Sequence, residues 1–449
     1  MPGATLSRWT MSYFALACLM LVAGQGLMVA GYGYPAAAIG APETLVIVHV
    51  LAIGWLSLLM AGALLQFVPV LVARPLLGGR FAGPALVLLI GGLGFLVAGF
   101  VALSGAAELP LALLALGGIL LLLGFSLVAA ILAATLLAAR ALPLPARFVA
   151  IGLVSLGGTI LLGVAFTLAL SGLGGGVPLA RLVADSVGLH AALGLGGWLS
   201  ITAAGVSYRL LAMFLLAPEG ERPTSRAVLW AASLAVGLVA ACIPFVLLAF
   251  SGAVPFAAAL LLTFIAVALY AGDVRHLYRA RKRRQAELNI RASFAAFAAL
   301  VLSVALFNVP AIRAGEGVAA LVYLFVFGWL TGLGLAQLYK IVAFLTWLEA
   351  YGPVLGRVPV PRVQDLVEER HARLWFLLYY GAVAAAVLAL FAGAPGLFRA
   401  IVLVQMIATV GLMREFIRAR RLSVVPDDLR VPAGMVRPHL FLPQSASRR

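Results

Sequence analysis

The segment HVLAIGWLSLLMAGALLQFVP, residues 49–69, carries a pattern that occurs twice more in the chain. It contains no Asp, Glu, Lys or Arg and is long enough to cross a bilayer as a helix, which needs about 20 residues. Its core aligns without gaps at spacings of 143 and 131 residues, each close to a third of the chain. The three copies are Gly54-Trp55-Leu56-Ser57, Gly197-Trp198-Leu199-Ser200 and Gly328-Trp329-Leu330-Thr331.

Two further positions of the pattern are shared. Eight residues after the first glycine stand small residues, which let membrane helices approach closely, and twelve residues after it stand long polar residues, which we expect to reach toward the headgroups. We interpret the tryptophans as packing residues. The pattern favours three four-helix arcs, at about residues 1–143, 144–285 and 286–425. The small set is Gly62, Gly205 and Ala336, and the polar set is Gln66, Arg209 and Lys340.

Composition places the chain in a membrane. Of its 449 residues 64% are hydrophobic and 10% are charged, whereas soluble domains have roughly 45–50% and about 25%. This excludes a soluble globule and a disordered chain. Cys18 and Cys242 both lie in apolar stretches, so the sequence has neither a disulfide framework nor a CxxC metal site.

Reading the apolar runs between charges and Pro/Gly punctuation predicts an all-α, polytopic transmembrane bundle of about twelve helices. We expect one transmembrane domain, residues 1–425, followed by a cytoplasmic tail, residues 426–449. The first run also fits a cleaved signal peptide, but the repeat favours a retained helix. The predicted spans are 10–31, 44–72, 83–104, 109–139, 147–171, 180–216, 226–250, 254–272, 289–308, 316–350, 371–393 and 396–418.

The charges predict the orientation. With the N-terminus inside, the outer loops contain only Arg181, Arg313 and Arg399, and the other 28 basic residues are inside. Including the acidic residues, the outer side carries −1 and the inner side +17. The positive-inside rule therefore predicts cytoplasmic termini, in what we expect to be a prokaryotic inner membrane. The basic excess indicates contact with anionic lipids and requires no nucleic acid.

Two of the five histidines are candidate ligands. His49 and His190 are predicted about five and ten residues into their helices, in the outer half of the membrane, where ionisable groups mark functional sites and neutral imidazole binds metals. The alternative is a hydrogen bond to a neighbouring helix's carbonyl. They precede their Gly-Trp pairs by five and seven residues, about 200° apart on a helix, which favours neighbouring sites. His276, His371 and His439 fall on the inner surface, where we expect solvated groups.

Three other residues are candidates. Tyr323 matches His49 in the third repeat and either hydrogen-bonds a bound group or belongs to the aromatic belt. Arg399, in an outer loop, either clamps an anionic group or meets lipid phosphate. Glu349 is the only carboxylate expected near membrane depth. The sequence shows no HExxH motif and no Gly-rich phosphate loop in a strand-to-helix setting.

Together, the twelve-helix plan, His49, Gly54-Trp55-Leu56 and Val68-Pro69, and His190 in the sixth helix resemble subunit I of the haem-copper oxidase superfamily, which includes nitric oxide reductases. The resemblance implies that His49 is a low-spin haem ligand, that His190 takes the place of the first copper or non-haem-metal ligand, and that Arg399 lies where family arginines contact haem propionates. The NnrS-like family of haem- and copper-containing membrane proteins is a neighbouring resemblance.

The chain also departs from this family. The resemblance implies further histidine pairs on the seventh and tenth helices, and this sequence has no histidine in either helix. We therefore predict a divergent member that binds b-type haem through His49, without a complete copper centre, for electron transfer or oxygen or nitric oxide handling. Any enzymatic activity would be that of an oxidoreductase, with a redox partner or another membrane subunit. The alternatives are a non-haem transporter and a non-catalytic scaffold or assembly protein.

Overall fold

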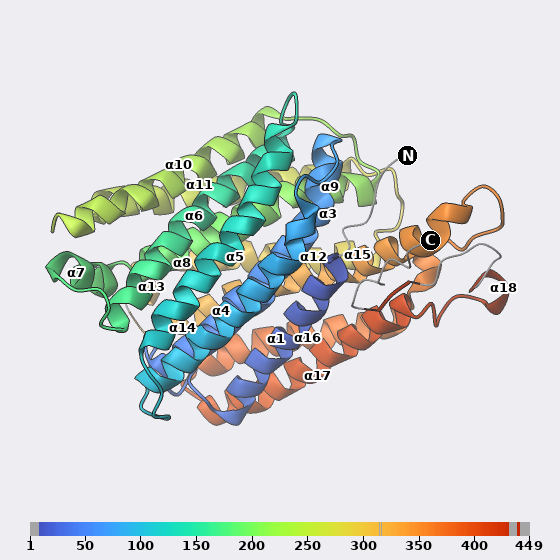
Figure 1. The fold of residues 1–449 in the computed structure, drawn as a ribbon. Coiled ribbons are helices and arrows are strands. Elements are labelled where there is room, and N and C mark those ends of the chain that lie inside the picture. The colour runs from blue at the N-terminus through green and yellow to red at the C-terminus, as the bar shows by residue number, and fades with distance from the viewer. Residues whose placement is uncertain (1–8, 314, 316, 431–437, 441–449) are drawn as a thin grey trace.

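The structure, a computed structural model, describes residues 9–313, 315, 317–430 and 438–440. Within these residues twelve helical spans are long and apolar enough to cross a membrane, and they run roughly side by side in one bundle (Figure 1). The all-α, polytopic prediction is confirmed. The spans are α1 (Thr10–Ala30), α2 to α3 (Pro42–Val72), η2 and α4 (Gly79–Leu103), α5 (Ala112–Leu137), α6 (Leu144–Leu170), α8 to α9 (Val187–Leu215), α10 (Pro223–Leu247), α11 (Ala253–Arg279), α12 (Leu288–Phe307), α14 to η5 (Gly317–Val354), α16 (Glu369–Phe391) and α17 (Pro395–Arg420).

Most span limits agree with the prediction to within a few residues, with two exceptions. The predicted span 180–216 is divided, because the helix breaks at Ser186 (φ −113°, ψ 5°) between a short α7 (Val177–Asp185) and α8 (Val187–Ala191). The helix expected to end at residue 272 continues to Arg279. The other short helices are α13 (Pro310–Arg313), η6 (Val363–Leu366) and α18 (Asp427–Arg430).

Each of the three repeated segments contains a stretch of π-helix. In a π-helix each backbone hydrogen bond joins residues five apart, instead of four apart as in an α-helix. These stretches are η1 (Val50–Ser57), η3 (Ala192–Ile201) and η4 (Leu324–Thr331). π-Helices are rare and occur mostly as single turns, frequently at functional sites. Three of them at matching positions show that the shared sequence pattern has a shared backbone geometry.

The spans that contain these π-helices form the centre of the bundle. In their apolar stretches 61%, 61% and 67% of residues are buried, against 50% or less in the other described spans. Each central helix packs against one end of a row of three outer helices, in which each helix contacts the next. The row α16, α17 and α1 packs on η1 and α3, the row α4, α5 and α6 packs on η3 and α9, and the row α10, α11 and α12 packs on η4 and α15. The division of the chain into repeats at residues 143 and 285 stays a prediction.

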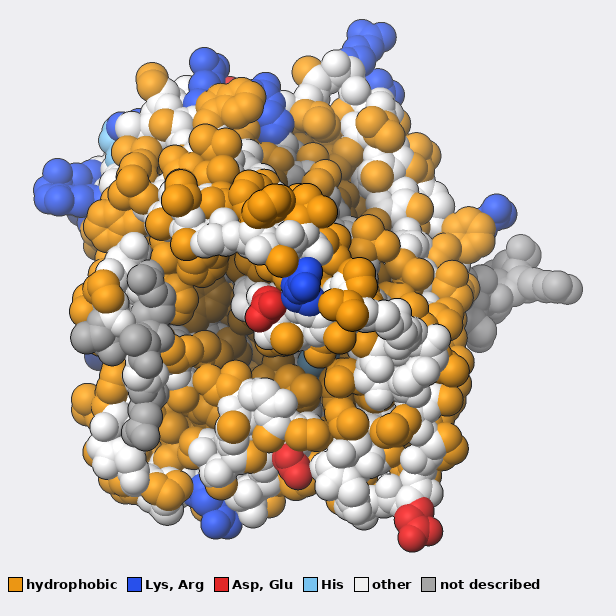
Figure 2. Space-filling view, turned by 90° about the vertical axis from the view of Figure 1, so that its left-hand side faces the viewer, with side chains coloured by type: hydrophobic (Ala, Val, Ile, Leu, Met, Phe, Trp, Pro, Cys, Tyr) orange, Lys and Arg blue, Asp and Glu red, His pale blue; other side chains and the backbone are white. Residues whose placement is uncertain are grey.

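The two ends of the bundle differ in charge. The first span begins and the last span ends at the same end of the bundle (Figure 1), which we call the inner end, following the charge count. The opposite, outer end contains α7, and Figure 2 shows it as a mainly hydrophobic face with few charged side chains and a hollow near its middle. Which end faces the cytoplasm stays a prediction, and most of the predicted tail, 426–449, lies outside the described residues.

Candidate functional site

The three repeat tryptophans join the central helices in a closed cycle. Each indole N–H donates to the hydroxyl of the residue that ends another repeat's motif. These bonds run from Trp55 to Thr331 (2.9 Å), from Trp329 to Ser200 (3.1 Å) and from Trp198 to Ser57 (3.1 Å). All three indoles are almost fully buried. The tryptophans therefore do more than pack, and the hydroxyls at the fourth motif position were the signal in the sequence.

The small repeat residues allow the close approach expected of them. A methyl group on Gly62 would lie 2.7 Å from Tyr13 of α1, and one on Gly205 would lie 2.2 Å from Phe148 of α6. Both distances are shorter than real carbon contacts, so larger residues would push the helices apart. Ala336, the third member of the set, is fully buried. The repeated small positions thus hold each central helix against its neighbour.

His49 is the last residue of α2 (Pro42–His49), immediately before η1. Its Nδ1 lies 2.8 Å from the backbone oxygen of Leu45, one turn earlier in the same helix. A neutral ring that donates from Nδ1 keeps its lone pair on Nε2, the arrangement typical of metal-binding histidines. The half-buried ring packs on Phe100 of α4, with 5.0 Å between ring centres.

His190 lies in α8, two residues before η3. It is closer to the helix start than predicted, because the break at Ser186 shortens the span. Its Nδ1 is buried without a hydrogen-bond partner among the described residues. The ring centre lies 5.5 Å from that of Phe166. His190 therefore offers the opposite ring nitrogen from His49.

The two histidines belong to one region of the molecule. They stand on adjacent central helices, just before the matching π-helices η1 and η3. A group of three or more His, Cys, Asp or Glu able to hold a metal is not found in the described part of the chain. The structure thus places the two imidazoles at corresponding positions of adjacent central helices.

Tyr323 occupies the position of the third repeat that corresponds to His49 in the first. It is 2% exposed and donates its hydroxyl to the side chain of Gln405 on α17. Its ring packs on Phe327 (4.5 Å between ring centres) and on Phe398 (5.2 Å). Because Tyr323 is surrounded by protein, the aromatic-belt interpretation is wrong. Its hydroxyl already has a protein partner, so contact with a bound group stays untested.

The outer arginines lie at helix ends. Arg399 Nε donates to the backbone oxygen of Val29, in the last turn of α1 (3.0 Å), and Arg181 Nη1 donates to that of Leu247, the last residue of α10 (3.2 Å). A guanidinium at a helix C-terminus satisfies free carbonyls and complements the helix dipole. Arg399 thus has a structural partner, and a role toward haem propionates stays a prediction.

The inner end holds a buried carboxylate that the sequence did not reveal. Asp273, in the unpredicted last turns of α11, is 2% exposed. It accepts from Arg222 (2.7 Å), Thr224 (2.6 Å) and Tyr208 (2.8 Å). The sequence indicated only Glu349 as a carboxylate near membrane depth, because the charges around residue 273 made this helical turn look like a loop. The membrane depth of both carboxylates stays a prediction. Glu349 itself pairs with the buried Arg420 (2.9 Å).

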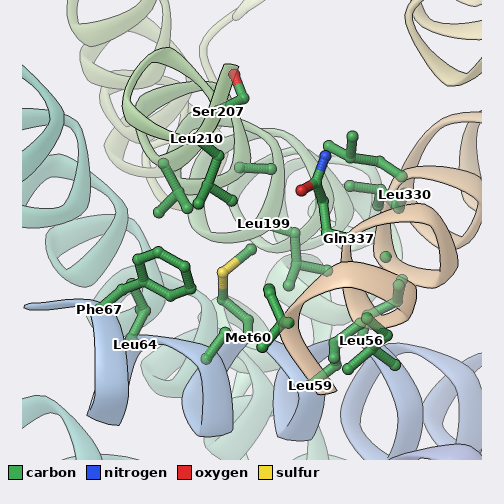
Figure 3. A pocket seen from close by; sticks show the side chains of 17 residues that line it. Leu56, Leu59, Met60, Leu64, Phe67, Leu199, Ser207, Leu210, Leu330 and Gln337 are labelled. Carbon is green, nitrogen blue, oxygen red and sulfur yellow. The ribbon is translucent and has the colours of Figure 1, made fainter. Parts of the chain in front are cut away.

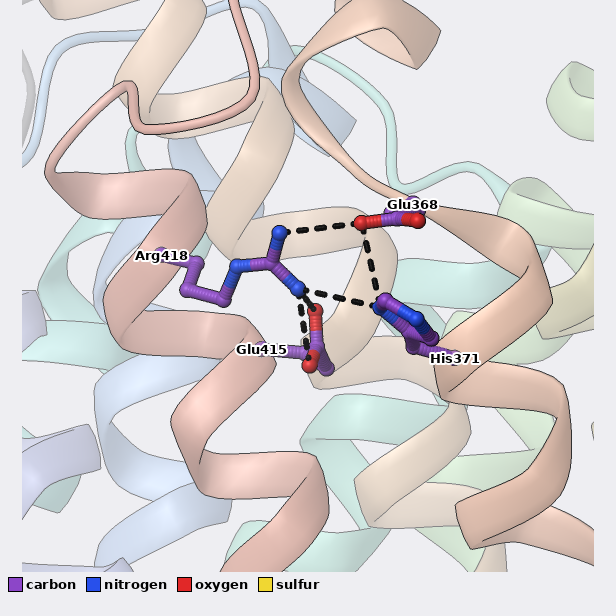
Figure 4. Close-up of polar contacts among 4 residues, drawn as sticks. All are labelled: Glu368, His371, Glu415 and Arg418. Atoms are coloured by element: carbon purple, nitrogen blue, oxygen red, sulfur yellow. Dashed lines mark hydrogen bonds and ion pairs between the residues drawn. The ribbon is translucent and has the colours of Figure 1, made fainter.

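A second inner cluster joins α16 to α17. Arg418 binds Glu368 (2.9 Å) and Glu415 (3.0 Å), and the imidazole of His371 lies 3.1 Å from Glu368 (Figure 4). The Arg418 hydrogen bond lowers the pKa of the Glu368 carboxyl from its usual value. His371 is exposed and belongs to this ion-pair network, so it forms no separate metal site within the described residues.

The twelve apolar helical spans within the described residues define an integral membrane protein. A solved structure of a heme-copper terminal oxidase dimer is similar to this chain with a TM-score of 0.66 and 12% sequence identity, over 98% of this chain and 86% of that one. The predicted likeness is therefore confirmed at the level of the fold. No protein-family model and no curated protein matches the sequence.

Proposed function

We propose that the chain binds a b-type haem in the outer half of the membrane, and that His49 would be a ligand of its iron. The observation that carries this proposal is the hydrogen bonding of the ring nitrogens of the two imidazoles. In His49 Nδ1 is held by the carbonyl of Leu45, which orients the ring and leaves Nε2 as the ligand atom. In His190 a buried Nδ1 has no protein partner among the described residues. A buried polar atom without a partner is costly, and an iron or copper ion would satisfy it.

His190 would be a second protein ligand of the haem or would hold a separate metal. Aromatic rings already flank both imidazoles, Phe100 beside His49 and Phe166 beside His190, and these apolar walls suit a large planar cofactor. The sequence has no CxxCH motif for covalent attachment, which favours a non-covalent haem. When bound, such a group supplies one-electron transfer or binding of a diatomic gas.

The protein's own residues set the limits of this function. Because α10 and the span α14 to η5 contain no histidine, the ligands of a complete binuclear centre are missing. We therefore infer electron transfer, or oxygen or nitric oxide binding, in place of oxygen reduction. Both histidines lie in spans toward the outer end, where Figure 2 shows a hollow, so a soluble redox partner would approach from that side.

The test is an absorption spectrum of the purified protein with a pyridine haemochrome assay and metal analysis. We expect a Soret band and a b-type haemochrome. His49→Ala should remove the haem, whereas His276→Ala, which changes an exposed histidine of α11, should retain it. Both variants are compared with the parent by size-exclusion chromatography, so that loss of haem is separated from loss of fold. A haem-free parent expressed with ample haem supply would refute the proposal and favour the scaffold.

A further inference from the structure

A cavity lies on the axis of the molecule, on the inner side of the tryptophan cycle. Its volume is about 80 Å³ and its walls come from the three central helices α3, α9 and α15 and the ends of their π-helices (Figure 3). It begins at Leu56, Leu199 and Leu330, each of which follows a tryptophan of the cycle. It extends to the level of Phe67 and Leu210, eleven residues further along each helix, which is about 17 Å at 1.5 Å per residue.

One polar group faces this cavity with an unused atom. Gln337 of α15 is 9% exposed, and its Nε2 donates to Ser293 Oγ of α12 (2.9 Å). Ser293 in turn donates its only hydroxyl hydrogen to the backbone oxygen of Asn289 (2.8 Å). The Ser293 oxygen must therefore accept from Gln337, which fixes the orientation of the amide. Gln337 Oε1 is left without a donor among the described residues, and its side chain extends into the cavity (Figure 3).

The second polar side chain in the wall is already occupied. Ser207 Oγ lies 2.7 Å from the backbone oxygen of Ala204 and also pairs with the hydroxyl of Tyr270. All the other wall residues are apolar. A water molecule bound to Gln337 would have one strong partner, while buried waters have two to four. The site therefore suits a molecule with an apolar body and a single hydrogen-bond donor.

We propose that this cavity is a binding site for an aliphatic alcohol, whose hydroxyl donates to Gln337 Oε1 while its chain lies against the leucines of the central helices. An apolar cavity of about 150 Å³ holds benzene, so the volume here fits a chain of a few carbons. Because the cavity is partly open, the hydroxyl end of a longer membrane alcohol is a second source of the same chemistry. The site is independent of the haem proposal, since it lies on the opposite side of the tryptophan cycle from both histidines.

The test is photolabelling of the full-length protein in lipid nanodiscs with two matched probes, a short diazirine-bearing alcohol and its methyl ether, which lacks the donor. We expect the alcohol to label peptides of α3, α9 and α15, and the ether to label them several-fold less. Gln337→Met keeps the side-chain length and removes the acceptor, so alcohol labelling should fall about fivefold to tenfold. Gln364→Met, in the exposed η6 turn, is the matched control and should change nothing.

Competition by unlabelled alcohols distinguishes a short alcohol from a longer membrane alcohol as the ligand. Butan-1-ol displaces the probe if the site accepts only short alcohols, and dodecan-1-ol displaces it at lower concentration if the chain extends through the open side. Ala63→Phe, which fills the cavity from α3, should abolish labelling by both probes. Equal labelling by alcohol and ether, or an unchanged signal in a folded Gln337→Met protein, would overturn the proposal, because either result means simple partition into apolar space.

Discussion

The inner and outer ends of this bundle are held together by different chemistry. Every ion pair found among the described residues lies at the inner end, for example those of Asp273, Glu349 and Glu368. At the outer end the two described loop arginines donate to helix carbonyls, and the two histidines keep ring nitrogens that bond no side chain. The ionisable groups of the inner end thus pair mainly with one another, whereas those described at the outer end bond backbone oxygens or, for Nδ1 of His190, no partner among the described residues.

The largest loss of stability is expected when the buried carboxylate of Asp273 loses its ion-pair partner. Arg222→Ala removes the ion-pair partner of Asp273 and should lower the free energy of unfolding by about 3 kcal/mol. Arg226→Ala is the matched control: its side chain is 60% exposed in an ion pair with Glu221, and should cost less than about 1 kcal/mol. Thermal and denaturant unfolding in detergent micelles measures both. Similar losses in the two variants would mean that burial of Asp273 is unimportant.

A smaller loss of stability is expected when a hydrogen bond of the tryptophan cycle, which lies between the two ends, is removed. Trp198→Phe removes the donor to Ser57 and some buried volume, and should cost about 2 kcal/mol. Trp230→Phe, at a position of α10 that is 72% exposed, should have almost no effect. A double-mutant cycle with Ser57→Ala should give a coupling of about 1 kcal/mol. A coupling near zero would show that the hydrogen bond adds nothing to packing.

A smaller effect is expected at the outer end. Arg399→Ala removes the hydrogen bond to the last turn of α1 and should cost about 0.5 kcal/mol. If Arg399 only stabilises that helix end, the haem content of the purified variant stays at the parental level. A loss of haem without a matching loss of stability would instead assign Arg399 to the ligand, as the resemblance to oxidases implies.

The smallest effect concerns pH and belongs to the inner end. The pKa of Glu368 is lowered, chiefly by the hydrogen bond from Arg418. A carboxyl whose pKa is lower in the folded state contributes stability above its unfolded pKa, near 4.3, and loses it as the pH falls through the folded pKa. Unfolding midpoints should therefore decrease slightly less between pH 6 and pH 3 for Glu368→Gln than for the parent. An identical or steeper decrease in the variant would contradict this.

The sequence predicted the spans well because hydropathy over 20 residues is a local property. The extension of α11 was missed because Asp273 and its neighbours are charged, and only the distant Arg222 and Tyr208 make that turn a buried one. The break at Ser186 and the three π-helices have no local signature that hydropathy detects. The repeat contains the three tryptophans, but it does not predict their pairing, because each hydroxyl partner is more than 100 residues away in the chain.

The ligand roles of the candidate site stay predictions. The sequence identifies His49 and His190 as candidates because ionisable residues inside apolar runs stand out. Their positions about 200° apart around a straight helix predict neighbouring sites, and the structure places both residues just before π-helices of adjacent central helices. The partner that orients His49 could not be predicted in the same way, because Leu45 contributes only a backbone oxygen.

The tryptophan cycle also bears on how the chain is assembled in a living membrane. Synthesis proceeds from the N-terminus, so Trp55 and Ser57 enter the bilayer long before residues 328–331 have been translated. Only the contact from Trp198 to Ser57 can form before the tenth helix arrives, and that helix supplies both Trp329 and Thr331. Insertion of one late segment thus completes two of the three bonds together, so a nascent chain truncated before it would leave Trp55 and Ser200 without their partners.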